Sequence, residues 1–150
     1  CQLLADMLTW VERHGAVAGR RAAWLGDGNN VCHSWMNAAQ LFDFELNVIT
    51  PAEQKPDAQL LEKTASHVRW STDVAEAAGA DLIVTDTWAS MGHEEEKEER
   101  QRIFRPYQVN QQVMAAASPD APAKLKHGRI NQIRSWACLC FFAKFHRAER

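Results

Sequence analysis

Apolar residues recur along this chain at two spacings, one typical of helices and one typical of buried strands. Between 2 and 14 the spacing is helical, and Gly15 can end that helix. Short apolar runs predict strands over 22–25, 44–49, 67–70 and 81–85. Further helices are expected over 31–42, from 57 through 61, and over 73–78, 94–104 and 111–117.

Polar residues mark the ends of several of these predicted helices. Asp57, after Pro56, can cap the helix that runs through 61. Ser71 or Thr72 can cap the helix over 73–78, which Gly79 would end. The pair 29–30, two asparagines, stands where the helix over 31–42 needs a cap.

Strands that alternate with helices at this spacing predict an open parallel sheet with helices on both faces, a Rossmann-like α/β fold. Right-handed crossovers would then place the loops that follow the strands on one edge of the sheet. Two of these loops are polar: 26–30 follows the first strand, and 86–92 follows the fourth. Ligands bind beyond the carboxyl ends of such strands, so both loops are expected to converge on one small molecule. Their amides, hydroxyl and carboxylates suit an amino acid that carries a free amine.

Composition narrows the class of protein. The 150 residues are enough for one domain with a core, and 46% hydrophobic with 24% charged residues is ordinary for a soluble globular protein. A net charge of -2 gives no general reason to expect nucleic acid or an anionic membrane as a partner. No apolar run approaches the roughly 20 residues of a membrane span. The four cysteines are oddly spaced for a disulfide framework, which favours a reduced, cytoplasmic setting.

The pattern changes near Ala121. From Pro122 onward, lysines and arginines accompany a single acid, Glu149, and a dense apolar stretch covers 136–142. We therefore expect a first unit over 1–121 and a basic tail over 122–150. A terminal helix with one solvated face would account for the basic composition of this tail.

Several features have structural interpretations that compete with a functional one. Gly26 and Gly28 suit a tight turn, and they do not form the dinucleotide fingerprint, because Val31 stands where its third glycine belongs. The acidic run 94–100 is expected to be a solvated helix face that includes a favourable Glu96–Arg100 pair, and Cys32 a small buried hydrophobe. The tail's Cys-x-Cys pair lacks the usual zinc spacing, so no metal is expected, and the missing third glycine argues against a nicotinamide cofactor, so no cofactor is expected either.

Both polar loops closely resemble those of ornithine carbamoyltransferases. The resemblance covers 26–34, then 86–92 followed by 94–97, and also 106–110. The opening 1–6 looks like the end of that family's His-Pro-Cys-Gln motif. The Ser-Met-Gly sequence at 90–92 is specific, since it separates ornithine enzymes from aspartate carbamoyltransferases. The resemblance spans 1 to about 121.

The resemblance implies the second domain of a carbamoyltransferase, which binds L-ornithine. The family transfers the carbamoyl group from carbamoyl phosphate to the δ-amine of ornithine, giving citrulline and phosphate, and commonly forms homotrimers. By motif position, Asn30 would hold the α-carboxylate or backbone groups of ornithine and Asp86 its α-ammonium. Ser90 and Met91 would close over the substrate, and Gln2 would touch the carbamoyl group of carbamoyl phosphate.

The chain also departs from the family. The Ser-Thr-Arg-Thr loop that binds phosphate belongs to the first domain, and 122–127 stands where the family has a strand ending in His-Cys-Leu-Pro. Cys138-Leu139 matches that motif only as a dipeptide. We therefore expect a chain that is catalytically incomplete, with no catalytic residue assigned. The alternative is a solitary domain that binds ornithine without turnover.

Overall fold

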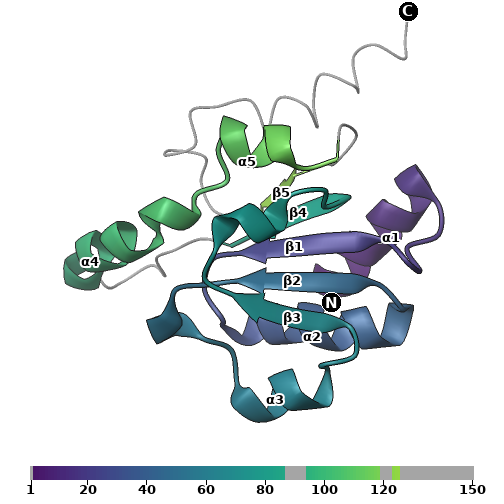
Figure 1. The fold of residues 1–150 in the computed structure, drawn as a ribbon, viewed down its shortest axis with the longest axis horizontal. Coiled ribbons are helices and arrows are strands. Elements are labelled where there is room, and N and C mark those ends of the chain that lie inside the picture. Colours follow the sequence, from purple (N-terminus) through teal and green to yellow (C-terminus); the bar gives the residue numbers. More distant parts are fainter. Residues whose placement is uncertain (1, 87–93, 119–122, 126–150) are drawn as a thin grey trace, which may run out of the picture.

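The protein folds around one parallel sheet. The computed structural model describes residues 2–86, 94–118 and 123–125. The strands lie in the order β3-β2-β1-β4-β5, and each neighbouring pair is parallel (Figure 1). The elements follow the chain as α1 (Gln2–His14), β1 (Arg21–Leu25), α2 (Asn30–Phe42), β2 (Glu45–Ile49), η1 (Ala52–Gln54), α3 (Ala58–Lys63), β3 (Val68–Ser71), η2 (Val74–Ala77), β4 (Leu82–Thr85), α4 (Glu94–Phe104), η3 (Arg105–Tyr107), α5 (Gln111–Ala116) and β5 (Ala123–Leu125).

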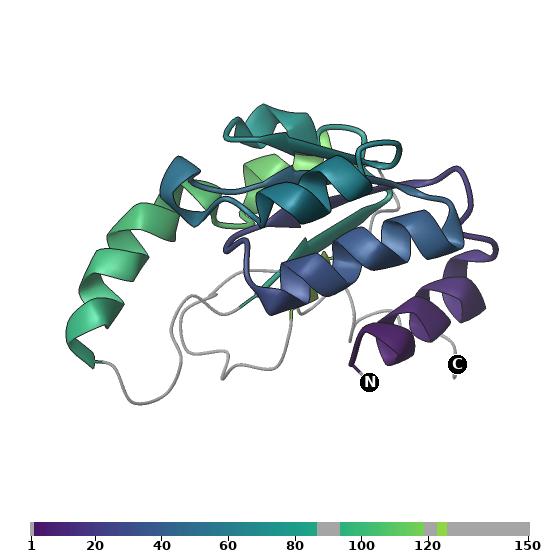
Figure 2. The same cartoon turned by 90° about the horizontal axis from the view of Figure 1, so that it is seen from below.

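Alternate residues of the strands feed two hydrophobic cores, one on each face of the sheet. Ala22 and Trp24 of β1 point into the core beneath α1 and α2. Ala23 and Leu25 point into the opposite core, which η2 and α5 cover (Figure 2). All four residues are fully buried, as period-2 alternation requires in a strand covered on both faces. The predicted fold class, an open parallel sheet with helices on both faces, is confirmed.

An aromatic cluster fixes α1 and α2 to the amino-terminal end of β2. Phe44, directly before β2, lies between Trp10 of α1 and Trp35 of α2. Its ring centroid is 5.5 Å from that of Trp10 and 6.2 Å from that of Trp35, both in edge-to-face geometry. Such pairs add to the free energy gained from burial alone. This cluster lies at the end of the sheet opposite the carboxyl ends of the strands.

One predicted helix is shorter and tighter than expected. The segment 73–78 is not an α-helix but the 3₁₀ turn η2, Val74–Ala77. Asp73, rather than Ser71 or Thr72, caps it by accepting a hydrogen bond from the backbone N–H of Ala75 at 2.9 Å. Gly79, with φ of +71°, follows so soon that no second helical turn fits, and 3₁₀ geometry suits such short pieces.

The sheet extends past the boundary that composition suggests. Ala123–Leu125 form β5, which pairs in parallel with β4 in the register Ile83 with Ala123 and Thr85 with Leu125. Strand pairing uses backbone groups, so the basic composition from Pro122 onward did not reveal it. The expected terminal helix lies outside the described residues. Within them, no helix is long and apolar enough to cross a bilayer.

The cap of α3 gives a first testable prediction. Asp57 accepts a hydrogen bond from the backbone N–H of Leu60 at 2.9 Å, as the sequence predicts. Replacing Asp57 with alanine is expected to lower the free energy of unfolding by about 1 kcal/mol, because the first turn of α3 loses this partner. Urea denaturation measures the change. Asp57→Ser keeps a capping oxygen and should lose less; an equal loss would show that the charge matters and the cap does not.

Candidate functional site

The candidate site lies where the order of the strands reverses. From β1 the chain moves outward to β2 and β3, then crosses back to β4 on the other side of β1. The carboxyl ends of β1 and β4 therefore lie side by side at the same edge of the sheet (Figure 1). In open α/β sheets this switch point is where ligands bind.

The loop after β1 is held closely against the neighbouring backbone. The N–H of Gly26 donates to the carbonyl of Ile49 at 3.1 Å, and the N–H of Gly28 donates to the carbonyl of Gln54 at 3.0 Å. A Cβ on Gly28 would lie 2.4 Å from that Gln54 oxygen, so only glycine fits there. The indole N–H of Trp24 donates to the backbone carbonyl of Asp27 at 3.0 Å.

The two polar loops meet through Asn29 and Asp86. The side-chain oxygen of Asn29 caps α2, accepting from the backbone N–H groups of Val31 at 2.9 Å and Cys32 at 3.2 Å. Its side-chain nitrogen donates to Oδ2 of Asp86 at 3.2 Å. Asp86 directly follows β4 and is only 8% exposed. The structure therefore places a buried carboxylate beside the N-terminus of a 13-residue helix.

The predicted site residues are only partly described. Asn30 is the first residue of α2 and is exposed, with its carbonyl accepting a hydrogen bond from the Ser34 hydroxyl at 2.9 Å. The neighbouring Asn29, which the sequence suggested only as a cap, is the residue in contact with Asp86. Ser90 and Met91 lie outside the described residues. Gln2 begins α1, and its side chain lies outside the described part as well.

The carboxylate of Asp27, in the loop after β1, interacts with two neighbouring groups. The carboxylate of Asp27 forms an ion pair with the guanidinium of Arg100, which belongs to α4. Burial raises the pKa of the Cys32 thiol, and the negative charge of Asp27 raises it further. The thiol stays protonated at neutral pH, which confirms the prediction that Cys32 is a small buried hydrophobe.

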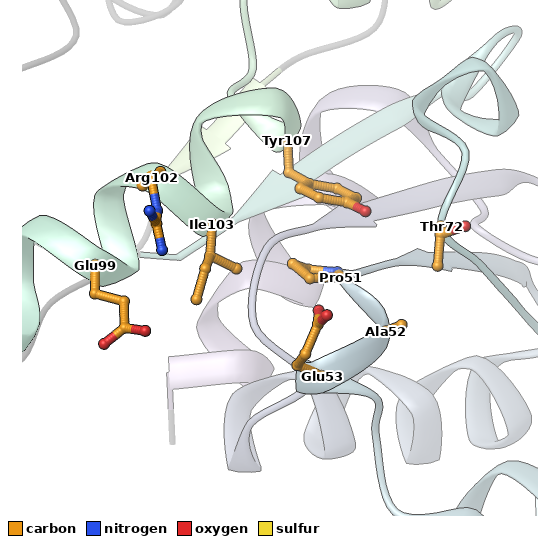
Figure 3. A pocket seen from close by; sticks show the side chains of 8 residues that line it. All are labelled: Pro51, Ala52, Glu53, Thr72, Glu99, Arg102, Ile103 and Tyr107. Atoms are coloured by element: carbon orange, nitrogen blue, oxygen red, sulfur yellow. The ribbon is translucent and has the colours of Figure 1, made fainter.

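A shallow hollow of about 630 Å³ lies beyond the carboxyl ends of β2 and β3, between η1 and the segment α4–η3 (Figure 3). The ring of Tyr107 lies near Pro51, and the carboxylate of Glu53 points toward it. Burial, and then the charge of Glu53, raises the pKa of the Tyr107 phenol, so this group remains a hydrogen-bond donor at neutral pH. The hollow is lined by Pro51, Ala52, Glu53, Thr72, Glu99, Arg102, Ile103 and Tyr107. Sequence analysis missed it because its walls come from segments far apart in the chain.

Residues 2–86, 94–118 and 123–125 hold no cluster of three or more His, Cys, Asp or Glu side chains that suits a metal ion. His33 instead accepts a hydrogen bond at Nε2 from the backbone N–H of Asp57 at 3.2 Å. This contact joins α2 to the start of α3.

Comparison with known proteins gives the family to which the chain belongs. A family model described as "Aspartate/ornithine carbamoyltransferase, Asp/Orn binding domain" matches residues 18–123. The ornithine carbamoyltransferase of Methylococcus capsulatus is 51% identical over 122 residues, covering 81% of this chain and 41% of the relative. That of Chromohalobacter salexigens is 49% identical over 119 residues, covering 79% and 39%. The chain thus spans about two fifths of the length of these curated relatives.

Solved structures show the same fold. The ornithine carbamoyltransferase of Pyrococcus furiosus superposes with a TM-score of 0.77 at 37% identity, covering 85% of this chain and 44% of that one. The enzyme from Thermus thermophilus gives a TM-score of 0.74 at 35% identity, covering 85% and 41%. Because the family model matches more than half of the 150 residues, this chain belongs to the aspartate/ornithine carbamoyltransferase family, and the matched segment is its Asp/Orn-binding domain.

Proposed function

We propose that this chain is the ornithine-binding part of an ornithine carbamoyltransferase. The observation that carries the proposal is the contact between Asn29 and Asp86, which joins the two polar loops at the switch point of the sheet. The names of the relatives and the Ser-Met-Gly sequence at 90–92 favour ornithine over aspartate as the amino acid.

The chemistry of the two loops suits the two charged groups of an amino acid's backbone. Asp86 receives the α-ammonium, because a carboxylate and an ammonium form a strong charge-assisted hydrogen bond where water is excluded. The N-terminus of α2 favours a negative charge, so the α-carboxylate lies there, against Asn30. In this proposal Ser90 and Met91 cover the bound amino acid, and Gln2 contacts the carbamoyl group.

In the reaction of the whole enzyme, the lone pair of the δ-amine attacks the carbonyl carbon of carbamoyl phosphate. A C–N bond forms, the C–O bond to phosphate breaks, phosphate leaves with the electron pair, and the nitrogen loses a proton. The part that this chain supplies is positioning: it fixes the α-carbon end so that the δ-amine is presented to the carbonyl. Such positioning is worth effective molarities of about 10⁵ M or more. Carbamoyl phosphate is held largely by parts of the enzyme that this chain does not match.

Calorimetry of the 150-residue chain with L-ornithine tests the proposal. We expect heat of binding at millimolar ornithine and none with L-aspartate at the same concentration. Absence of ornithine binding would overturn the proposal. Incubation with ornithine and carbamoyl phosphate is expected to give no citrulline, because positioning of the amino acid alone does not supply the phosphate-binding groups.

The role of Asp86 gives a sharper prediction. Replacing Asp86 with asparagine keeps the shape of the side chain and removes its charge. We expect ornithine affinity to fall about thirtyfold, since a hydrogen bond to a charged group contributes about 2 kcal/mol. Glu62→Gln, on the exposed face of α3, makes the same change in net charge away from the site and should leave the affinity unchanged. Equal losses in both variants would show that overall charge, and not contact, attracts the ligand.

A further inference from the structure

We propose that Asp27 and Arg100 are a positioning pair for the amino-acid site. Through this ion pair, helix α4 holds the loop after β1 in the position at which Asn29 meets Asp86. The inference rests on the proposed function, because the site that the pair positions is the one assigned to ornithine. Neither residue is placed in contact with the ligand.

The pair links segments that are 73 residues apart in the chain. Nη2 of Arg100 donates to Oδ2 of Asp27, and the two side chains are 31% and 15% exposed. The guanidinium also lies over the ring of Phe104, 5.2 Å from its centroid. Phe104 is fully buried. Arg100 is therefore fixed between the core and the loop, which makes α4 a support for the loop.

The loop has little freedom to choose another position for Asn29. Gly26 and Gly28 hold it through neutral backbone hydrogen bonds, and the ion pair at Asp27 adds a charged link between them. Asn29 follows two residues after Asp27, and its amide meets Asp86 at 3.2 Å, the long end of the normal range. A small displacement of the loop would lengthen this contact beyond a hydrogen bond.

An effect on ligand affinity can be separated from an effect on folding. Arg100 and Asp27 keep 31% and 15% of their side-chain surface exposed, so water can still reach either charge when its partner is removed. Loss of the pair should therefore leave the protein folded. A change in the geometry of Asn29 would instead weaken ornithine binding directly.

The experiment uses the 150-residue chain with Asp27→Asn, Arg100→Gln and the double variant. Each single change is expected to weaken ornithine binding about fivefold, and the double variant no more than either, because residues that act through one contact are not additive. In ¹⁵N-resolved NMR spectra, the side-chain amide of Asn29 and the indole N–H of Trp24 should shift in all three variants. Arg100→Lys keeps the positive charge and should recover part of the affinity.

A second, more exposed ion pair on the same sheet serves as the control. Arg21 at the start of β1 and Glu45 at the start of β2 are paired at 3.5 Å, at the end of the sheet away from the site. Glu45→Gln removes that pair and should change neither ornithine affinity nor the Asn29 resonance. The inference is overturned if the Asn29 resonance is unmoved in the Asp27 and Arg100 variants, or if their losses of affinity add. If the unmodified chain binds no ornithine, the proposed function fails, while the Asn29 and Trp24 resonances still decide whether the pair positions the loop.

Discussion

Replacing Phe44 with alanine is expected to lower the free energy of unfolding by about 4 kcal/mol. Phe44 is 1% exposed and packs edge-to-face on both Trp10 and Trp35, so its removal leaves a cavity beneath two helices and ends two aromatic contacts. Because a domain of this size is stabilised by only about 5–15 kcal/mol, much of its stability is at stake. Urea denaturation followed by tryptophan fluorescence measures the loss.

Phe44→Leu is the matched control for this change. Leucine refills most of the volume and removes only the aromatic contacts, so its cost should be clearly smaller, about 1.5 kcal/mol. If both variants lose the same free energy of unfolding, the lost aromatic contacts would contribute more to the effect than the cavity does. Since Phe44 lies at the amino-terminal end of β2, the folded fraction of either variant should keep its affinity for ornithine.

Gly28→Ala is expected to cost about 3 kcal/mol, because a side chain there overpacks a rigid part of the fold. The added Cβ would lie 2.4 Å from the carbonyl oxygen of Gln54 and 2.6 Å from the nitrogen of Pro56, both backbone atoms with no flexible end to move. The loop after β1 must shift, so ornithine affinity should fall as well. Thermal or urea unfolding gives the first quantity and calorimetry the second.

Gly15→Ala is the control for Gly28→Ala, because it replaces a glycine at a position where the added Cβ meets no other atom. Gly15 has a φ of +76° and nothing within 4 Å of an added Cβ, so its cost comes only from backbone strain, about 1 kcal/mol. It also lies at the end of α1, away from the site, and should leave binding intact. An equal cost at both positions would mean that the backbone around Gln54 moves aside easily.

Much of the fold could be predicted because most elements are determined by residues that lie close together in the sequence. The helix over 2–14, the strand before Gly26 and the cap at Asp57 all depend on residues close together in the sequence, and the structure agrees with each. The predictions failed where local pattern is weak. The segment 73–78 is too short to distinguish an α-helix from a 3₁₀ turn, and β5 is a three-residue strand whose pairing depends on the backbone of β4.

Only one property of the site could be predicted from the topology, namely that the segments following β1 and β4 lie close together. The convergence of the loop after β1 on Asp86 follows from parallel strands on neighbouring positions, and the structure shows it. The resemblance assigned Asn30 to the amino acid, whereas the side chain in contact with Asp86 is that of its neighbour Asn29. Only the geometry of the cap on α2 selects Asn29. The ion pair of Asp27 with Arg100 was equally hidden, because the two residues are 73 positions apart in the chain.

The placement of the site on β1 and β4 has a consequence for local unfolding. Both strands have a neighbour on each side, whereas β3 and β5 are the outermost strands among the described residues. Marginal strands open at lower free energy than central ones, and they exchange their amide hydrogens first. Transient fraying of either outer strand therefore leaves Asn29 and Asp86 anchored, so the contact at the proposed site persists when the outer strands open.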